Sequence, residues 1–104
     1  MRREVWLAGV LLTLAFSLAA APAPEVSAPE LTQRLGCWAC HSRQGEGGKR
    51  AASLDQIGAR LAPGDLQGVL ARPRSRHPGA KMPSYAYLRP QEMQALVDYL
   101  AARK

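Results

Sequence analysis

The sequence predicts an all-α fold, in which three to four short helices and their loops form one small domain. Apolar residues near the end of the chain recur at helical spacing, at Met93, Leu96, Val97 and Leu100. No segment shows the alternation of apolar and polar residues that is typical of a half-buried strand. A chain of 104 residues holds one domain at most.

The C-terminal helix is predicted to begin at Pro90, because proline suits the first helical position. Glu92 lies in its first turn, and Arg103 and Lys104 lie at its end. These charges are opposite in sign to the partial charges of the two helix ends. One face of this helix is therefore expected to pack against the rest of the domain.

A first helix is predicted over residues 29–40, with Leu31 and Leu35 on its apolar side. Glycine inside a helix costs on the order of 1 kcal/mol relative to alanine. We therefore expect Gly36 to mark the place where another helix crosses closely.

Residues 42–61 contain several glycines and no sustained period, so they are predicted to be a loop that wraps around a ligand. After them, Leu66, Val69 and Leu70 follow Asp65 at helical spacing. This pattern predicts a short helix that is capped by Asp65 and ends before Pro73.

The N-terminal residues 1–21 resemble a secretory signal peptide. Arg2 and Arg3 give a positive start, and residues 5–21 contain no charged side chain. The segment is also long enough to remain as an uncleaved membrane anchor. Residues 22–29 alternate proline with alanine and small residues, which predicts an extended linker. The domain itself is expected to span residues 30–104.

The most specific motif is Cys37-Trp38-Ala39-Cys40-His41, the C-x-x-C-H attachment pattern of covalent haem. The chain has two cysteines and two histidines, and three of these four residues lie in this pentapeptide. The alternatives are a redox dithiol, which expects a βαβ pattern, and half of a zinc site, which expects two further ligands nearby. Neither context is present, so the motif predicts one haem c with His41 as an iron ligand.

The second axial position on the iron has several candidates. Met93 lies on the apolar face of the C-terminal helix, where methionine is most often part of the core. His77 lies in an arginine-rich segment, where a solvated side chain is more usual. Met82 lies in a turn-rich segment beside Pro83 and has no core to fill. An open sixth position is the remaining alternative.

The net charge of +6 favours acidic protein partners or a membrane surface over nucleic acid in an exported protein. The densest basic cluster consists of Arg72, Arg74, Arg76, His77 and Lys81. It is interpreted either as a docking patch or as a solvated loop.

The sequence resembles the class I bacterial cytochromes c over residues 29–104. This family combines an early C-x-x-C-H, a later M-P and a terminal helix that ends in Y-L. The matching residues are Leu54, Ile57-Gly58-Ala59-Arg60, Pro73-Arg74, Pro78-Gly79, Met82-Pro83-Ser84-Tyr85, Leu88, Glu92, Leu96 and Tyr99-Leu100.

The resemblance implies that Met82 is the distal ligand and that Tyr85 lies against the cofactor. It places Arg60 beside a haem propionate, with a surface salt bridge as the alternative interpretation of this arginine. It also places the crossing of the first and last helices at Gly36, against Leu96 or Tyr99. Two features depart from the family: Ala51-Ala52-Ser53 replaces the usual Gly-Pro before Leu54, and no aromatic residue precedes Cys37 in the first helix.

With both axial positions filled, the expected function is single-electron transfer between redox partners, without catalysis. Bacterial haem attachment takes place outside the cytoplasmic membrane, so we expect the periplasm or the outer face of that membrane. The alternative is a haem subunit of an exported oxidoreductase complex, for example one that oxidises sulfur compounds or supplies a terminal oxidase. A haem enzyme or gas sensor would require an open sixth position.

Overall fold

A computed structural model describes residues 15, 17 and 26–104 of the chain. The predicted signal peptide or anchor over residues 1–21, apart from two residues, and residues 22–25 of the predicted linker over 22–29 lie outside the described residues. Within the described part of the chain, no helix has both the length and the hydropathy that a membrane crossing needs.

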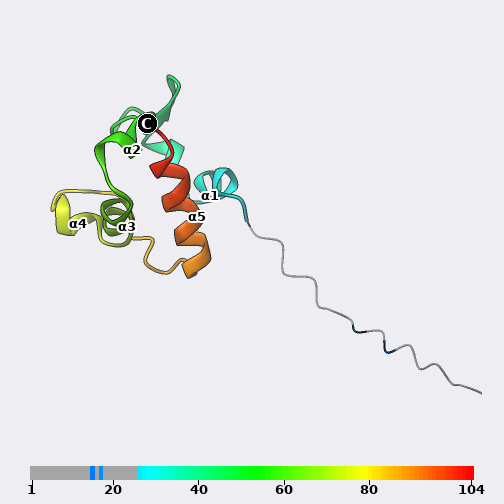
Figure 1. Cartoon of the computed structure of the whole chain (residues 1–104). Coiled ribbons are helices and arrows are strands. Elements are labelled where there is room, and N and C mark those ends of the chain that lie inside the picture. The colour runs from blue at the N-terminus through cyan, green and yellow to red at the C-terminus, as the bar shows by residue number, and fades with distance from the viewer. Residues whose placement is uncertain (1–14, 16, 18–25) are drawn as a thin grey trace, which may run out of the picture.

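The domain is mostly helical, and its last helix lies at the centre (Figure 1). Helix α5 contacts α1, α2 and α3. The predicted all-α class is confirmed, with more short elements than expected. In chain order these are α1 (Ala28–Arg34), the 3-10 turn η1 (Cys37–Ala39), β1 (Ser42–Arg43), β2 (Glu46–Gly47), α2 (Ile57–Arg60), α3 (Pro63–Ala71), α4 (Pro73–Arg76) and α5 (Pro90–Ala101).

Helix α5 forms where its apolar period and Pro90 predict it. Pro90 occupies the first turn, and the Glu92 carboxylate accepts a hydrogen bond from the Arg89 main-chain N–H at 3.0 Å. Hydrogen bonds from Arg89 hold the pKa of Glu92 below its usual value. The four residues of the predicted apolar face are all buried, and Leu96 has no exposed surface. They form the core together with Leu54, Leu66, Leu70 and Tyr85.

Helix α1 is shorter than predicted because Gly36 ends it. The Ser27 hydroxyl caps its first turn by accepting the Glu30 N–H at 3.3 Å. At the other end, Gly36 adopts the left-handed conformation with φ of 73°, which glycine tolerates and which commonly terminates helices. A Cβ atom at Gly36 would meet no atom within 4 Å. The prediction that another helix crosses closely at this glycine is therefore wrong.

The close approach occurs instead at Gly58, in the first turn of α2. A Cβ atom there would collide with the main-chain carbonyl of Ala101, at the end of α5. The Gly58 N–H donates to the Arg103 carbonyl oxygen at 2.7 Å. Glycine is thus required where α2 meets the C-terminus of α5, and this contact fixes the end of the central helix.

The segment over residues 42–61 was predicted to be a loop, but it contains β1, β2 and α2. Strands β1 and β2 form an antiparallel hairpin that pairs Ser42 with Gly47. Gln44 and Gly45 both have positive φ, 51° and 78°, which is typical of a two-residue turn that matches the twist of a hairpin. Such short strands leave almost no alternation in the sequence to predict them.

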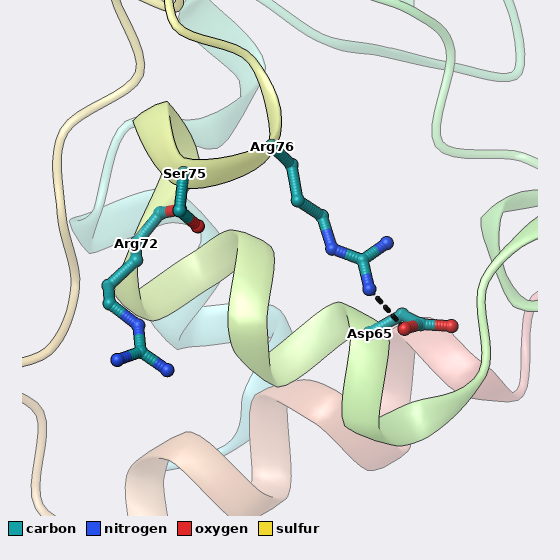
Figure 2. A network of polar contacts seen from close by, with 4 residues as sticks. All are labelled: Asp65, Arg72, Ser75 and Arg76. Atoms are coloured by element: carbon teal, nitrogen blue, oxygen red, sulfur yellow. Dashed lines mark hydrogen bonds and ion pairs between the residues drawn. The ribbon is translucent and has the colours of Figure 1, made fainter.

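Helix α3 begins two residues before Asp65, which lies in its first turn and does not cap it. The helix ends before Pro73, as predicted. The Asp65 carboxylate pairs with Arg76 of α4, as Figure 2 shows. The four-residue helix α4, which has no apolar period, is thereby attached to the start of α3.

Candidate haem site

The C-x-x-C-H motif forms one compact turn. Gly36 precedes it, and the N–H groups of Cys40 and His41 both donate to the Cys37 carbonyl, at 3.3 and 3.0 Å. Residues after the hairpin lie against this turn: Gly48 N–H donates to the Trp38 carbonyl at 2.8 Å, and Ala51 N–H donates to the Cys40 carbonyl at 2.9 Å. Residues 48–51 therefore pack against the motif, and their hydrogen bonds fix the shape of its turn.

Two adjoining cavities lie beside this turn and share Cys37, His41 and Met82. The inner one has a volume of about 90 Å³ and is otherwise lined by Thr32, Leu54, Ile57, Leu61, Leu66, Val69, Leu70, Leu96 and Leu100. The outer one, of about 370 Å³, is otherwise lined by Gly36, Cys40, Arg50, Gly79, Ala80, Lys81 and Tyr85. The inner wall is almost wholly apolar, whereas the outer rim carries cations.

The His41 ring is oriented by a main-chain carbonyl. Its Nδ1 atom lies 2.7 Å from the Ala52 oxygen. A carbonyl can only accept, so Nδ1 carries the proton and Nε2 keeps its lone pair for a metal. The Gly-Pro that is usual in the family is missing here. The Ala52 carbonyl instead supplies the acceptor that orients a ligating histidine.

The three candidates for the distal ligand lie in different places. Met82 is half-buried and lines both cavities together with His41. Met93 is buried in the core on α5, and His77 is exposed beyond the end of α4. Neither Met93 nor His77 lines either cavity. Of the three side chains, only that of Met82 shares a cavity wall with His41.

Tyr85 lines the outer cavity, from a position that is 5% exposed. Its hydroxyl donates to the Leu35 carbonyl at 3.1 Å. Burial, and next the nearby Cys37, raise the pKa of Tyr85, which keeps the hydroxyl protonated as a donor. Burial likewise raises the pKa of the Cys37 thiol. Tyr85 thus connects the Met82 segment to the carbonyl at which α1 ends.

Arg60 lies outside both cavities, at the end of α2. Its guanidinium donates to the Ser53 carbonyl at 2.8 Å. Ser53 follows Ala52 directly in the chain. The hydrogen bond from Arg60 therefore helps to hold the segment whose carbonyl accepts from His41. The propionate contact that the resemblance implies for Arg60 stays a prediction.

The family model described as Cytochrome c matches residues 28–104 of the chain. The chain belongs to the cytochrome c family. No curated protein and no solved structure matches it. As a member of this family, the cytochrome is a haem electron carrier that binds haem c covalently.

The residues of the site fit this cofactor. Two cysteines spaced as in C-x-x-C-H can form the two thioethers, and His41 offers a free Nε2. The inner cavity offers an apolar wall to the flat face of a porphyrin. Among the described residues, no group of three His, Cys, Asp or Glu side chains is arranged to hold a bare metal ion. The two cysteines and the free Nε2 of His41 suit an iron that is held within a covalently attached porphyrin.

The predicted basic cluster is divided by its contacts. Arg76 pairs with Asp65, and Arg74 donates to the Met82 carbonyl at 3.1 Å. Arg72 is exposed and points away from the ion pair (Figure 2). Of the cluster, only Lys81 lines the outer cavity, and Arg50, which lies outside the cluster, joins it there.

A stack of aromatic and cationic side chains connects the motif with the C-terminal end of the chain. The sequence did not predict this stack. Trp38 donates through Nε1 to the buried Thr32 hydroxyl at 3.1 Å. The Arg43 guanidinium lies 4.9 Å from the Trp38 ring centre and donates to the Tyr99 hydroxyl at 3.1 Å. Arg103 lies 4.0 Å above the Tyr99 ring. These contacts join the motif to α5 without an aromatic residue in α1.

Proposed function

We propose that this cytochrome carries single electrons with His41 and Met82 as the two axial ligands of its haem iron. The observation that carries the proposal is that both side chains, together with Cys37, line the same two adjoining cavities. The bound haem c supplies an iron that cycles between the ferrous and ferric states. Methionine and histidine ligation favours a raised reduction potential and leaves no position for a substrate.

The protein's own residues would keep the site unchanged during this cycle. The Ala52 carbonyl holds the His41 ring in one orientation, and the leucines of the inner cavity would keep water away from a bound haem. Little then needs to move when the charge on the iron changes, because the surrounding groups are already in place. Such preorganisation suits rapid electron exchange rather than bond chemistry.

The test of this ligation is the visible absorption spectrum of the purified cytochrome, oxidised, reduced, and reduced under carbon monoxide. We expect a low-spin c-type spectrum with the methionine-to-ferric-iron band, and no shift with carbon monoxide. A high-spin spectrum, or a ready shift with carbon monoxide, would show an open sixth position. That result would favour a sensor or a haem enzyme.

We further propose that partners dock at the mouth of the outer cavity. Arg50 and Lys81 are exposed at this rim. Tyr87 is 73% exposed, and its ring centre lies 6.4 Å from that of Tyr85, which lines the same cavity. Aromatic side chains and arginine are enriched at docking surfaces, and the two cations make this rim positive. It fits a redox protein with acidic groups around its own redox centre.

The rate of oxidation by ferricyanide, a small anionic oxidant, tests the charge at this mouth. We expect Lys81→Gln and Arg50→Gln each to slow the reaction roughly two- to three-fold at low ionic strength, and to lessen its dependence on salt. Arg72→Gln is the control, because it removes the same charge outside the cavity. Equal effects from all three variants would mean that only net charge matters, and the mouth would lose its assigned role.

We also propose that the cytochrome acts in the periplasm or at the outer face of the cytoplasmic membrane. Two independent features support export: the signal-like start, with its positive residues and the uncharged stretch over residues 5–21, and the haem motif. The proline-containing linker over residues 22–29 suits a domain held at a distance from a membrane or from a larger subunit. Stable co-purification with such a subunit would favour the alternative of a complex-bound haem subunit over a free carrier.

A further inference from the structure

The segment that carries Met82 has little regular structure to hold it. Residues 80–84 lie in neither helix nor strand. Within the described chain, the N–H groups of Lys81, Met82 and Ser84 donate to no main-chain carbonyl, and Pro83 has no N–H. Such a segment opens at low cost in free energy unless side chains fix it. An iron–methionine bond would need the methionine to be held in place.

Two contacts tie the end of this segment to the last turn of α3. The Ser84 hydroxyl donates to the Ala71 carbonyl at 2.6 Å. The Tyr85 N–H donates to the Leu70 carbonyl at 2.8 Å. Both contacts lie after Met82, so neither reaches the main chain at or before the methionine.

Arg74 reaches that main chain directly. Its Nη1 atom donates to the Met82 carbonyl at 3.1 Å and approaches the Ala80 carbonyl at 3.5 Å. Arg74 belongs to α4, which is itself fixed. Pro73 is buried, and Arg76 pairs with Asp65 (Figure 2). The guanidinium therefore extends from an anchored helix to the carbonyl of the methionine.

We propose that Arg74 is a positioning residue for the distal ligand, which holds the main chain of Met82 so that its sulfur stays at the iron. This inference rests on the proposed ligation by Met82. It assigns Arg74 an internal role, although this arginine is a member of an exposed basic cluster. A hydrogen bond from a charged donor is stronger than one between neutral groups, which suits a single contact that must restrain a flexible segment.

The affinity of the ferric protein for added imidazole measures this role, because imidazole binds only where methionine has left the iron. We expect Arg74→Ala to raise that affinity roughly five- to ten-fold, as follows from the usual strength of such a bond. Arg74→Lys keeps the positive charge but lacks the planar guanidinium, and it should raise the imidazole affinity by a smaller factor. Arg72→Ala is the control, because it removes an equal charge two residues away and should leave the affinity unchanged.

A second series of variants distinguishes the positioning of Met82 from a general destabilisation of the domain. In the Met82→Ala background the sixth position is already open, so adding Arg74→Ala should not raise the imidazole affinity further. A continued increase in that background would overturn the proposal, as would equal increases from Arg74→Ala and Arg72→Ala. The wild-type spectrum is recorded first. If it lacks the methionine band, the ligation and the role of Arg74 fail together; if the band is present and Arg74→Ala changes nothing, only Arg74 loses its role.

Discussion

Replacing Met82 with alanine is expected to abolish the methionine-to-ferric-iron band and to let the reduced protein bind carbon monoxide. The alanine side chain cannot reach the iron, and the outer cavity that Met82 lines would give small ligands a path to it. The reduction potential should fall, because the methionine that favours ferrous iron is gone. Ferric imidazole affinity should rise roughly ten-fold or more, because no protein ligand competes.

Met93→Ala is the matched control for this experiment. Met93 is buried in α5 and lines neither cavity. Its truncation should lower the free energy of unfolding by about 2–5 kcal/mol but leave the band and the carbon monoxide response as in the wild type. If Met82→Ala kept the band, or if Met93→Ala removed it, the proposed ligand would be the wrong methionine.

A Cys37→Ser, Cys40→Ser double variant is expected to be largely unfolded at room temperature. The two thioethers attach the haem to the motif, and the inner cavity would otherwise expose an apolar wall of leucines. A domain over residues 30–104 buries little core of its own. Without the covalent cofactor, the stability that remains is too small to offset the entropy of ordering the chain.

Far-UV circular dichroism during urea titration measures this loss, and haem staining of a denaturing gel reports attachment. Ala39→Ser, an exposed position inside the same turn, is the control and should retain both haem and a cooperative transition. A cooperative, native-like transition in the double cysteine variant would show that the helices alone suffice. The stabilising role of the haem would then be wrong.

The parts of this cytochrome that the sequence predicted are those with a local signal. Helix α5 combines an apolar period with a proline start. In the structure the helix begins at Pro90 and buries its apolar face, because packing and local preference favour the same helix. The C-x-x-C-H motif needs only its own spacing to be recognised. The Met82 segment was identified by its resemblance to the family, and the structure places Met82 on the same cavity walls as His41.

The parts that could not be predicted depend on contacts between distant segments. A glycine permits both a left-handed turn and a close approach. The sequence alone therefore did not assign the turn to Gly36 and the close approach to Gly58. Helix α4 lacks an apolar face, and its anchor Asp65 lies 11 residues from Arg76. Arg74 looked like one surface cation among several, because nothing local reveals which carbonyl it reaches.

The acceptor for the His41 ring is a main-chain oxygen, and every amino acid carries one. Ala52 contributes no side-chain chemistry to this contact. A substitution of the Ala52 side chain would therefore leave the acceptor of the His41 ring in place. What must be preserved is the length and path of the chain from the motif through the hairpin to Ala52. An insertion or deletion between His41 and Ala52 would displace this carbonyl, and a side chain at Gly47 or Gly48 would collide with the main chain of the motif.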